Sequence, residues 1–200
     1  MKKVLIFGIL SVLVFANFNA DDSESANTWT TYKADEKSTS YSPLDQINVS
    51  NVNQLQHVWT FQMNDVQQGE QPVSSQSNPI IIDGVMYANS AKQTVCAINA
   101  QTGEQIWAFT ALADGEPSAA SRGVTYWEKG GDKRILYSAG NYLMAINAKT
   151  GRLIKSFGEK GRVNLNVGVR DDPDKISVTL TTPGSIFKDL IIVGSRLPDF

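Results

Sequence analysis

Residues 97–103 read AINAQTG and residues 145–151 read AINAKTG, so a single position distinguishes the two stretches. An apolar run precedes each stretch, and a Thr-Gly step ends it. Asn and Thr side chains hydrogen-bond nearby backbone in turns, and Gly adopts the positive φ that a tight hairpin turn requires. The pattern therefore predicts the same strand-to-strand turn twice, at a period of about 48 residues.

The similarity extends upstream of both turns. Residues 80–87 (IIIDGVMY) read as a strand, a turn and a second strand, and residues 124–138 repeat this plan around a Gly-Gly-Asp turn. A third copy begins at residues 186–193. With last strands expected over residues 105–109 and 153–157, each repeat predicts four antiparallel strands.

Four antiparallel strands repeated every 40 to 50 residues or so are typical of a β-propeller, whose blades stack because one sheet cannot bury both of its faces alone. Trp107 is placed to cover the neighbouring repeat. We therefore expect an all-β fold containing the first two to three blades of a propeller. Since a closed propeller needs at least about four blades, the chain is expected to be an N-terminal part of a longer protein. A naturally short protein that closes as an oligomer is the alternative.

The first twenty residues have the order of a secretory signal: Met1-Lys2-Lys3, an apolar stretch over residues 4–18, and Ala20 before two aspartates. We expect a signal peptide over residues 1–20 and one partial propeller domain over residues 21–200. The mature protein is expected in the periplasm, either free there or associated with the membrane. An uncleaved N-terminal anchor is the alternative.

Composition excludes several kinds of function. The chain has 18 Lys and Arg against 20 Asp and Glu, a net charge of -2, and no basic stripe that would neutralise nucleic-acid phosphates. One His and one Cys cannot build a zinc site of three or four such ligands. We expect His57 to be a surface residue and Cys96 to be a buried, inert thiol. Cys96 also lies too far from the signal to carry the lipid of a lipoprotein.

Residues 41–48 read YSPLDQIN, and VWTF follows at residues 58–61. With these stretches, the chain from Trp29 to about Ser195 resembles the pyrroloquinoline-quinone (PQQ) dependent dehydrogenases, eight-bladed quinoprotein propellers that oxidise alcohols or aldoses. Residues 41–48 are similar to the N-terminal segment of that family. Residues 97–107 (AINAQTGEQIW) resemble its tryptophan-docking motif, Ala-x-Asp-x-x-Thr-Gly-x-x-x-Trp. Asn99 and Asn147 stand where Asp is usual, and Lys155 replaces the second Trp, so Phe157 is expected to take over docking there.

The resemblance also implies cofactor-binding residues. Residues 121–127 (SRGVTYW) are similar to the family segment whose Arg contacts PQQ, which makes Arg122 the first candidate. PQQ carries three carboxylates, and a guanidinium recognises carboxylates through two parallel hydrogen bonds. Thr181 resembles a family Thr that binds a PQQ carboxylate, although the adjacent Thr182 fits equally well. Gln76 stands where alcohol-oxidising relatives carry a Glu directed toward the cofactor.

Other features of the family differ or lie elsewhere. Ser118-Ala119-Ala120 occupies the region where the alcohol dehydrogenase branch has two adjacent cysteines, so the pattern is closer to the glucose dehydrogenase branch, whose His before the Arg is also missing. The family's Asp general base and its Ca²⁺ ligands are expected beyond residue 200. No catalytic or metal-binding residue is therefore predicted within the chain.

The resemblance implies a periplasmic PQQ-dependent oxidoreductase that oxidises an alcohol or sugar hydroxyl, uses Ca²⁺, and passes electrons to ubiquinone or a cytochrome. Two alternatives stay open at this point. One is a non-catalytic propeller scaffold similar to outer-membrane assembly lipoproteins. The other is a degenerate quinoprotein that has kept the propeller and lost cofactor binding.

Overall fold

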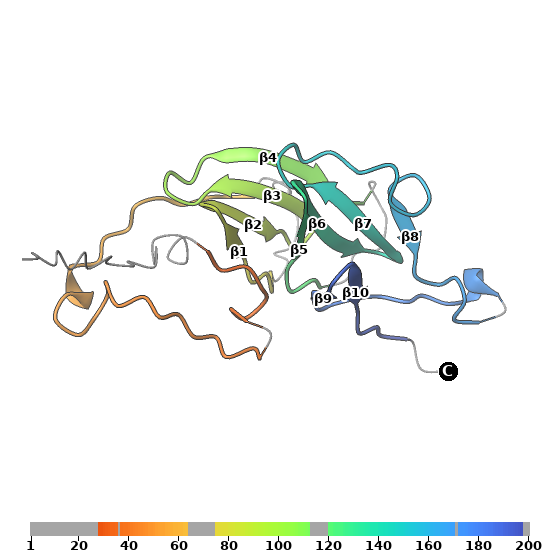
Figure 1. Cartoon of the computed structure of the whole chain (residues 1–200), viewed down its shortest axis with the longest axis horizontal. Coiled ribbons are helices and arrows are strands. Elements are labelled where there is room, and N and C mark those ends of the chain that lie inside the picture. Colours follow the sequence, from red (N-terminus) through yellow and green to blue (C-terminus); the bar gives the residue numbers. More distant parts are fainter. Residues whose placement is uncertain (1–27, 36, 64–74, 113–119, 171, 198–200) are drawn as a thin grey trace, which may run out of the picture.

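The computed structural model describes residues 28–35, 37–63, 75–112, 120–170 and 172–197, so the expected signal peptide lies outside the described residues. These residues form two four-stranded antiparallel sheets and one two-stranded hairpin (Figure 1). The first sheet contains β1 (Ile80–Ile82), β2 (Val85–Asn89), β3 (Thr94–Asn99) and β4 (Gln105–Thr110). The second contains β5 (Thr125–Lys129), β6 (Asp132–Ala139), β7 (Tyr142–Asn147) and β8 (Arg162–Asn164). The hairpin is β9 (Ser185–Phe187) with β10 (Leu190–Ile192), and two short 3-10 helices, Val52–Gln54 and Pro173–Lys175, lie in the connections.

Both four-stranded sheets are simple meanders in which consecutive strands pair. This architecture confirms the all-β prediction and its repeat: two blades and the first two strands of a third lie within the described residues. The 3.6-residue periodicity of a long helix is absent from the sequence after residue 20. Within the described residues, no helix is long and apolar enough to cross a membrane.

The Asn-x-Thr-Gly turns have the predicted local structure. The side-chain oxygen of Asn99 accepts hydrogen bonds from the backbone N–H groups of Gln101 and Thr102, at 2.9 and 3.1 Å. Asn147 makes the equivalent bonds in the second sheet. Gly103 and Gly151 follow with φ of 75° and 69°. An amide oxygen thus performs the acceptor role of the Asp that is usual in the family motif.

Trp107 joins the two sheets. A Cβ atom built on Gly151 would lie 2.7 Å from Cδ2 of Trp107, so the indole ring lies directly against this glycine of the next sheet. The Trp107 ring nitrogen donates to the carbonyl oxygen of Ala148 at 2.9 Å. Tyr87 packs beside the indole, with ring centroids 5.9 Å apart, and donates to the same carbonyl. The expected covering of the neighbouring repeat by Trp107 is confirmed.

A second tryptophan docks in the same way. A Cβ atom on Gly103 would lie 2.6 Å from Cδ2 of Trp59, which comes from the extended segment before the first sheet. This role of Trp59 was not predicted from the sequence. The signal was present, because Trp59 precedes Gly103 by the same number of residues as Trp107 precedes Gly151.

The prediction of a last strand over residues 153–157 was wrong. Leu153 forms an isolated bridge to Ile146, and the backbone N–H of Ile154 donates to the carbonyl oxygen of Ala145, after which the chain turns away from the sheet. It returns as β8, where Arg162 pairs with Met144. Positive φ values at Gly158 and Gly161 allow this excursion, and the apolar pattern alone did not reveal it. Lys155 and Phe157 therefore lie in a loop, and docking by Phe157 stays a prediction.

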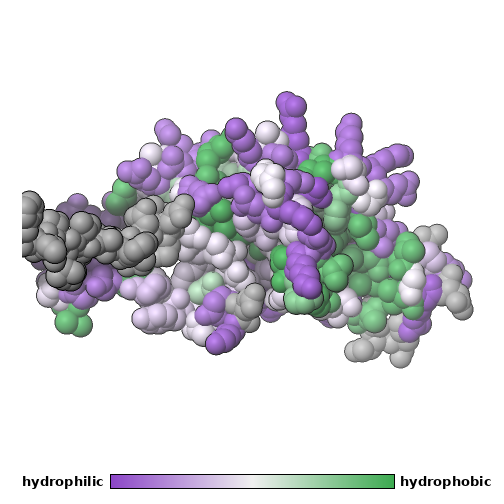
Figure 2. Space-filling view, viewed as in Figure 1, coloured by the Kyte–Doolittle hydropathy of each residue, from purple (hydrophilic) through white to green (hydrophobic). Residues whose placement is uncertain are grey.

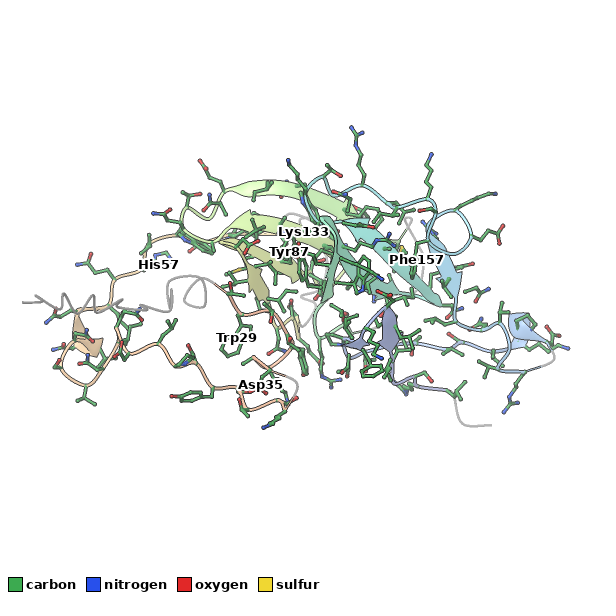
Figure 3. The ribbon with its side chains drawn as sticks, viewed as in Figure 1. Trp29, Asp35, His57, Tyr87, Lys133 and Phe157 are labelled. Atoms are coloured by element: carbon green, nitrogen blue, oxygen red, sulfur yellow. The ribbon has the colours of Figure 1, made fainter. Side chains whose placement is uncertain are left out.

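The core lies between the two sheets and is built from apolar residues of both, including Ile80, Val95, Ile135 and Ile146, each 0% exposed. Figure 2 shows hydrophilic side chains along the edge that contains β4 and hydrophobic ones over the region of β9 and β10. Cys96 is buried in β3, as predicted. His57 is exposed and lies away from both sheets (Figure 3), which confirms its surface position.

Candidate cofactor site

Three segments far apart in the sequence come together just before the first strand of each repeat. The backbone N–H of Asn78 donates to the carbonyl oxygen of Arg122, and the N–H of Arg122 donates to that of Thr181, both at 2.9 Å. These residues precede β1, β5 and β9, respectively. The fold therefore brings Arg122 and Thr181 into direct contact and places the segment of Gln76 beside them.

The side chain of Arg122 extends this contact. Its Nη1 atom donates to the hydroxyl oxygens of Thr181 and Thr182, at 3.4 and 3.5 Å. The Arg122 side chain is only partly buried, and among the described residues it has no carboxylate partner. A guanidinium has five N–H donors in a planar arrangement. The remaining donors can bind an anion, with two threonine hydroxyl groups beside them.

Thr181 and Thr182 are both placed beside the Arg122 guanidinium. Both hydroxyl groups contact the same guanidinium nitrogen at nearly the same distance. Thr181 is partly buried and Thr182 is exposed. Both can therefore offer a hydroxyl group to a ligand that Arg122 binds.

Gly123 is required for the close approach of these segments. Its φ of 144° lies in a region that favours glycine, and a Cβ atom there would lie 2.8 Å from the carbonyl oxygen of Asn78. No role of its own was predicted for Gly123 from the sequence. Its position directly after the candidate Arg was the available signal.

Gln76 lies in the first of the three segments, and its side chain is exposed. Its carbonyl oxygen accepts a hydrogen bond from the side-chain amide of Asn78 at 3.2 Å. No described residue hydrogen-bonds to the Gln76 carboxamide, so this group is available to a ligand. The structure thus places all three predicted residues in adjoining segments, with a direct contact between two of them.

The described residues fit the carboxylates of PQQ better than they fit a metal ion. Arg122 and the two threonines offer one cation and two hydroxyl groups. By contrast, no group of three or more His, Cys, Asp or Glu residues that could hold a metal occurs within the described ranges. Ser118 and Ala119, from the region where the alcohol dehydrogenase branch has two adjacent cysteines, lie outside those ranges.

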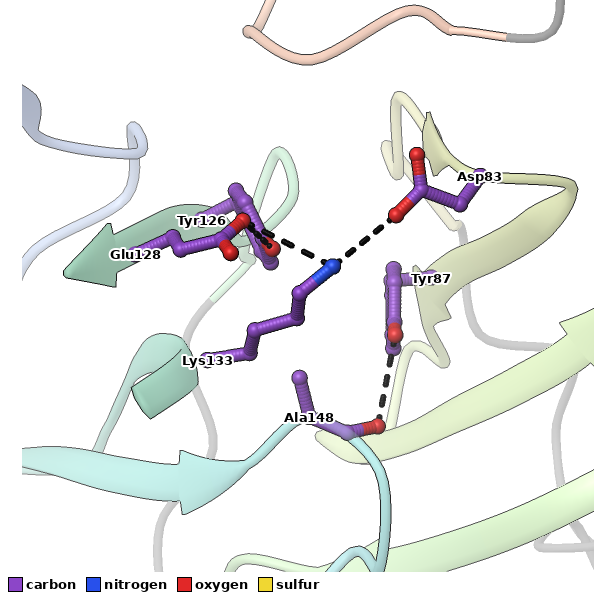
Figure 4. A network of polar contacts seen from close by, with 6 residues as sticks. All are labelled: Asp83, Tyr87, Tyr126, Glu128, Lys133 and Ala148. Atoms are coloured by element: carbon purple, nitrogen blue, oxygen red, sulfur yellow. Dashed lines mark hydrogen bonds and ion pairs between the residues drawn. The ribbon is translucent and has the colours of Figure 1, made fainter. Parts of the chain in front are cut away.

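A second polar cluster joins the two sheets away from these segments (Figure 4). Lys133 at the start of β6 donates to Asp83 at 2.9 Å and lies 3.6 Å from Glu128. The hydrogen bond to Asp83 raises the pKa of Lys133. Burial, and then the hydrogen bond to Glu128, raise the pKa of the Tyr126 phenol well above its usual range, so Tyr126 stays neutral. This cluster pairs every charge it contains, which is consistent with a structural role.

A family model and several relatives of known activity match most of the chain. The family model of the glucose/ethanol/alcohol dehydrogenase β-propeller domain, designated PQQ, matches residues 29–200. The quinoprotein glucose dehydrogenase of Escherichia coli is 28% identical over 86% of this chain and 24% of its own length. The dehydrogenase subunit of the alcohol dehydrogenase (quinone) of Gluconacetobacter polyoxogenes is 33% identical over 92% of this chain and 24% of its own length.

Solved structures show the same fold. The quinohemoprotein alcohol dehydrogenase of Comamonas testosteroni superposes with a TM-score of 0.68 at 26% identity, over 88% of this chain and 24% of the other. A europium-containing methanol dehydrogenase gives a TM-score of 0.62 at 19% identity, which supports the fold alone. The chain spans about a quarter of the length of the relatives it matches.

Proposed function

Since the chain belongs to the family of PQQ-dependent glucose, ethanol and alcohol dehydrogenase β-propellers, we propose that the protein is a PQQ-dependent oxidoreductase acting on an alcohol or aldose hydroxyl group. The observation that carries this proposal is the contact among Arg122, Thr181 and Thr182. It presents a partly exposed guanidinium that has no described carboxylate partner at the junction of three repeats.

Arg122 binds a carboxylate of the cofactor in this proposal. A carboxylate held by a guanidinium makes short, charge-assisted hydrogen bonds, which are about twice as strong as neutral ones. Thr181 and Thr182 contribute hydroxyl groups that can donate to the same anion once the guanidinium turns toward it. Two backbone hydrogen bonds hold Arg122 in place before the ligand arrives: its carbonyl oxygen accepts from the N–H of Asn78, and its own N–H donates to the carbonyl oxygen of Thr181.

Gln76 has a different role. Its carboxamide can both donate to and accept from a cofactor oxygen without adding a negative charge beside the carboxylates. When bound, PQQ supplies the ortho-quinone that accepts the electrons of the substrate. The described residues bind and orient this group, and we assign no proton transfer to them.

The remaining parts of the proposal concern the whole protein. We propose that Ca²⁺ ligands and a general base lie beyond residue 200, and that the acceptor is ubiquinone or a cytochrome. The apolar N-terminal stretch after Lys2 and Lys3 supports export to the periplasm. The alcohol and glucose dehydrogenases among its relatives support the substrate class.

Equilibrium titration of the complete gene product with PQQ tests the proposal. Binding is followed through quenching of tryptophan fluorescence, with the wild type, Arg122→Ala and the control Arg152→Ala compared. Arg152 is exposed and lies after the Thr-Gly turn of the second sheet. We expect Arg122→Ala to lower PQQ affinity about 10-fold or more, because it loses a hydrogen bond from a charged group. Arg152→Ala is expected to leave the affinity unchanged.

Two outcomes would count against this function. Equal PQQ affinity of the wild type and Arg122→Ala would remove Arg122 from the site. A wild-type protein that binds no PQQ, with or without Ca²⁺, would instead favour the scaffold or the degenerate quinoprotein. If the wild type does bind PQQ, dye-linked oxidation of a panel of alcohols and aldoses by the PQQ-loaded protein identifies the substrate class.

A further inference from the structure

Asn89 and Ser138 occupy the same position in the two repeats. Asn89, the last residue of β2, pairs with Val95, and Ser138 in β6 pairs with Leu143. Val95 and Leu143 are themselves equivalent, because each precedes its AINA stretch by two residues. Each polar side chain adjoins buried apolar residues of its own strand, Ala88 in the first sheet and Tyr137 and Ala139 in the second. Neither position was predicted from the sequence to have a role.

Asn89 is 2% exposed and fully hydrogen-bonded. Its side-chain amide donates to the carbonyl oxygens of Ser90 and Ser121, both at 3.2 Å. Its side-chain oxygen accepts a hydrogen bond from the hydroxyl group of Ser77 at 3.0 Å. Asn89 therefore links Ser77, which follows Gln76, to Ser121, which precedes Arg122.

The bond to Ser121 fixes one peptide unit from two sides. The carbonyl group of Ser121 and the N–H of Arg122 belong to the same planar peptide bond and point in opposite directions. The carbonyl accepts from Asn89 of the first repeat, and the N–H donates to Thr181 at the start of the third. The peptide that carries Arg122 is thus held between the repeats on either side of it.

Ser138 repeats this arrangement one blade later. Its hydroxyl group donates to the carbonyl oxygen of Leu180 at 3.1 Å, and Leu180 directly precedes Thr181. Leu180 is 4% exposed, so this bond lies at the edge of the core. In both repeats, the second-strand side chain therefore reaches the carbonyl group immediately before a candidate cofactor residue of the next repeat.

We propose that Asn89 and Ser138 are positioning residues that set the placement of Arg122 and Thr181 for cofactor binding. The expected effect on PQQ binding rests on the proposed function. The placement itself rests on the hydrogen bonds from Asn89 to Ser121 and from Ser138 to Leu180. Binding groups held within a fraction of an ångström by surrounding hydrogen bonds bind more tightly than loose ones, since less order must be imposed when the ligand arrives. Neither residue needs to touch the ligand.

Hydrogen exchange tests the geometry without a ligand. The Arg122 amide proton is followed by mass spectrometry or NMR in the apo form of the complete gene product, for the wild type, Asn89→Ala and Ser138→Ala. We expect its exchange to be about 10-fold faster in both variants, because local opening becomes easier. Ser138→Ala removes only one half-buried hydroxyl group and is the milder variant should Asn89→Ala fail to fold.

The control is Asn147→Ala. It also removes an Asn oxygen that accepts backbone hydrogen bonds, but at the opposite end of the strands, where Asn147 pairs with Arg134. It is expected to lower the melting temperature without changing exchange at Arg122 or the affinity for PQQ. This comparison separates a general loss of stability from a loss of placement.

A double-mutant cycle with PQQ tests the consequence. Asn89→Ala is expected to weaken binding about 10-fold when Arg122 is present and less than about 2-fold in the Arg122→Ala background, because residues that act through one another are not additive. Ser138→Ala is analysed in the same cycle. A purely structural role would give the same decrease in both backgrounds.

The outcomes distinguish the two proposals. Unchanged exchange at Arg122 in both variants overturns the positioning role, and so does an equal loss of PQQ affinity in both Arg122 backgrounds. Faster exchange together with full PQQ binding by Arg122→Ala supports the geometric role and overturns the proposed cofactor role of Arg122. Faster exchange with the expected coupling supports both.

Discussion

The indole ring of Trp107 lies against Gly151, so that an aromatic ring from one sheet covers the turn glycine of the next. Trp59 and Gly103 repeat this contact one step earlier in the chain. The contact requires a residue without a side chain, since a Cβ atom at either glycine would overlap the ring. It also fixes how far one sheet is from its neighbour.

Gly151→Ala is therefore expected to destabilise the protein more than the control Gly130→Ala. Both glycines have positive φ, 69° and 57°, so both substitutions incur backbone strain of about 1–2 kcal/mol. Only Gly151 has an atom in the way, whereas no atom lies within 4 Å of a Cβ on Gly130. The difference, about 1–3 kcal/mol for overpacking, is measured by urea unfolding of the complete gene product. Equal losses would mean that the tryptophan contact can relax at little cost.

Trp107→Ala removes the other partner of the contact with Gly151, the indole ring. Trp107 is 8% exposed and belongs to the core between the sheets, so a loss of about 3–5 kcal/mol in the free energy of unfolding is expected. The neighbouring residue Ile106 is 50% exposed, and Ile106→Ala serves as the control with a loss below about 1 kcal/mol. Similar losses for the two variants would contradict the docking role.

The pair of Asp132 and Arg134 makes stability depend on acidity. The hydrogen bond from Arg134 lowers the pKa of Asp132 below its ordinary value of 3.8. The stabilisation is therefore fully present above pH 3.8 and is lost as the pH falls through the lowered pKa. Because the Asp132 side chain is 41% exposed, solvent screens the pair and its contribution stays below about 1 kcal/mol.

Comparison of melting temperatures for the wild type and Asp132→Asn checks this dependence. The wild type is expected to be slightly more stable at pH 7, with the difference vanishing as the pH drops below 3.8. Asp45→Asn, which removes an exposed carboxylate of the N-terminal segment, is the control for the change in net charge. A difference that grows in acid would have the wrong sign for a carboxylate with a lowered pKa.

Gly123→Ala is expected to weaken PQQ binding about 10-fold, because the added Cβ pushes against the carbonyl oxygen of Asn78 and displaces the adjacent Arg122. Gly194→Ala is the control, since a Cβ there meets no atom within 4 Å. Fluorescence titration of both variants measures the effect. Unchanged affinity for Gly123→Ala would show that the site tolerates movement of this segment.

Much of the fold could be predicted because its determinants are local. The hairpin turns are predicted by Asn99, Asn147 and the glycines that follow them, and the spacing of the two copies predicts the length of the repeat. The path of the chain after Leu153 could not be predicted in this way. It depends on positive φ at Gly158 and Gly161 and on the pairing of Arg162 with Met144, which connects residues whose pairing no local pattern encodes.

The candidate site was accessible from the sequence only in part. Arg122, Thr181 and Gln76 were found through a family resemblance, while their proximity depends on hydrogen bonds between three distant segments. Asn89 and Ser138 were missed because a polar residue near a strand end carries no distinctive local signal. Only the strand register shows that the two positions are equivalent and that both reach the next repeat.

The decisive experiment is a structure of the complete gene product with PQQ bound, in which the distance from the Arg122 guanidinium to the nearest carboxylate oxygen of the cofactor is measured. We expect a charge-assisted hydrogen bond of about 2.7–2.9 Å, with Thr181 or Thr182 beside the same carboxylate. PQQ bound at another place, or an Arg122 side chain that faces solvent in the complex, would contradict it.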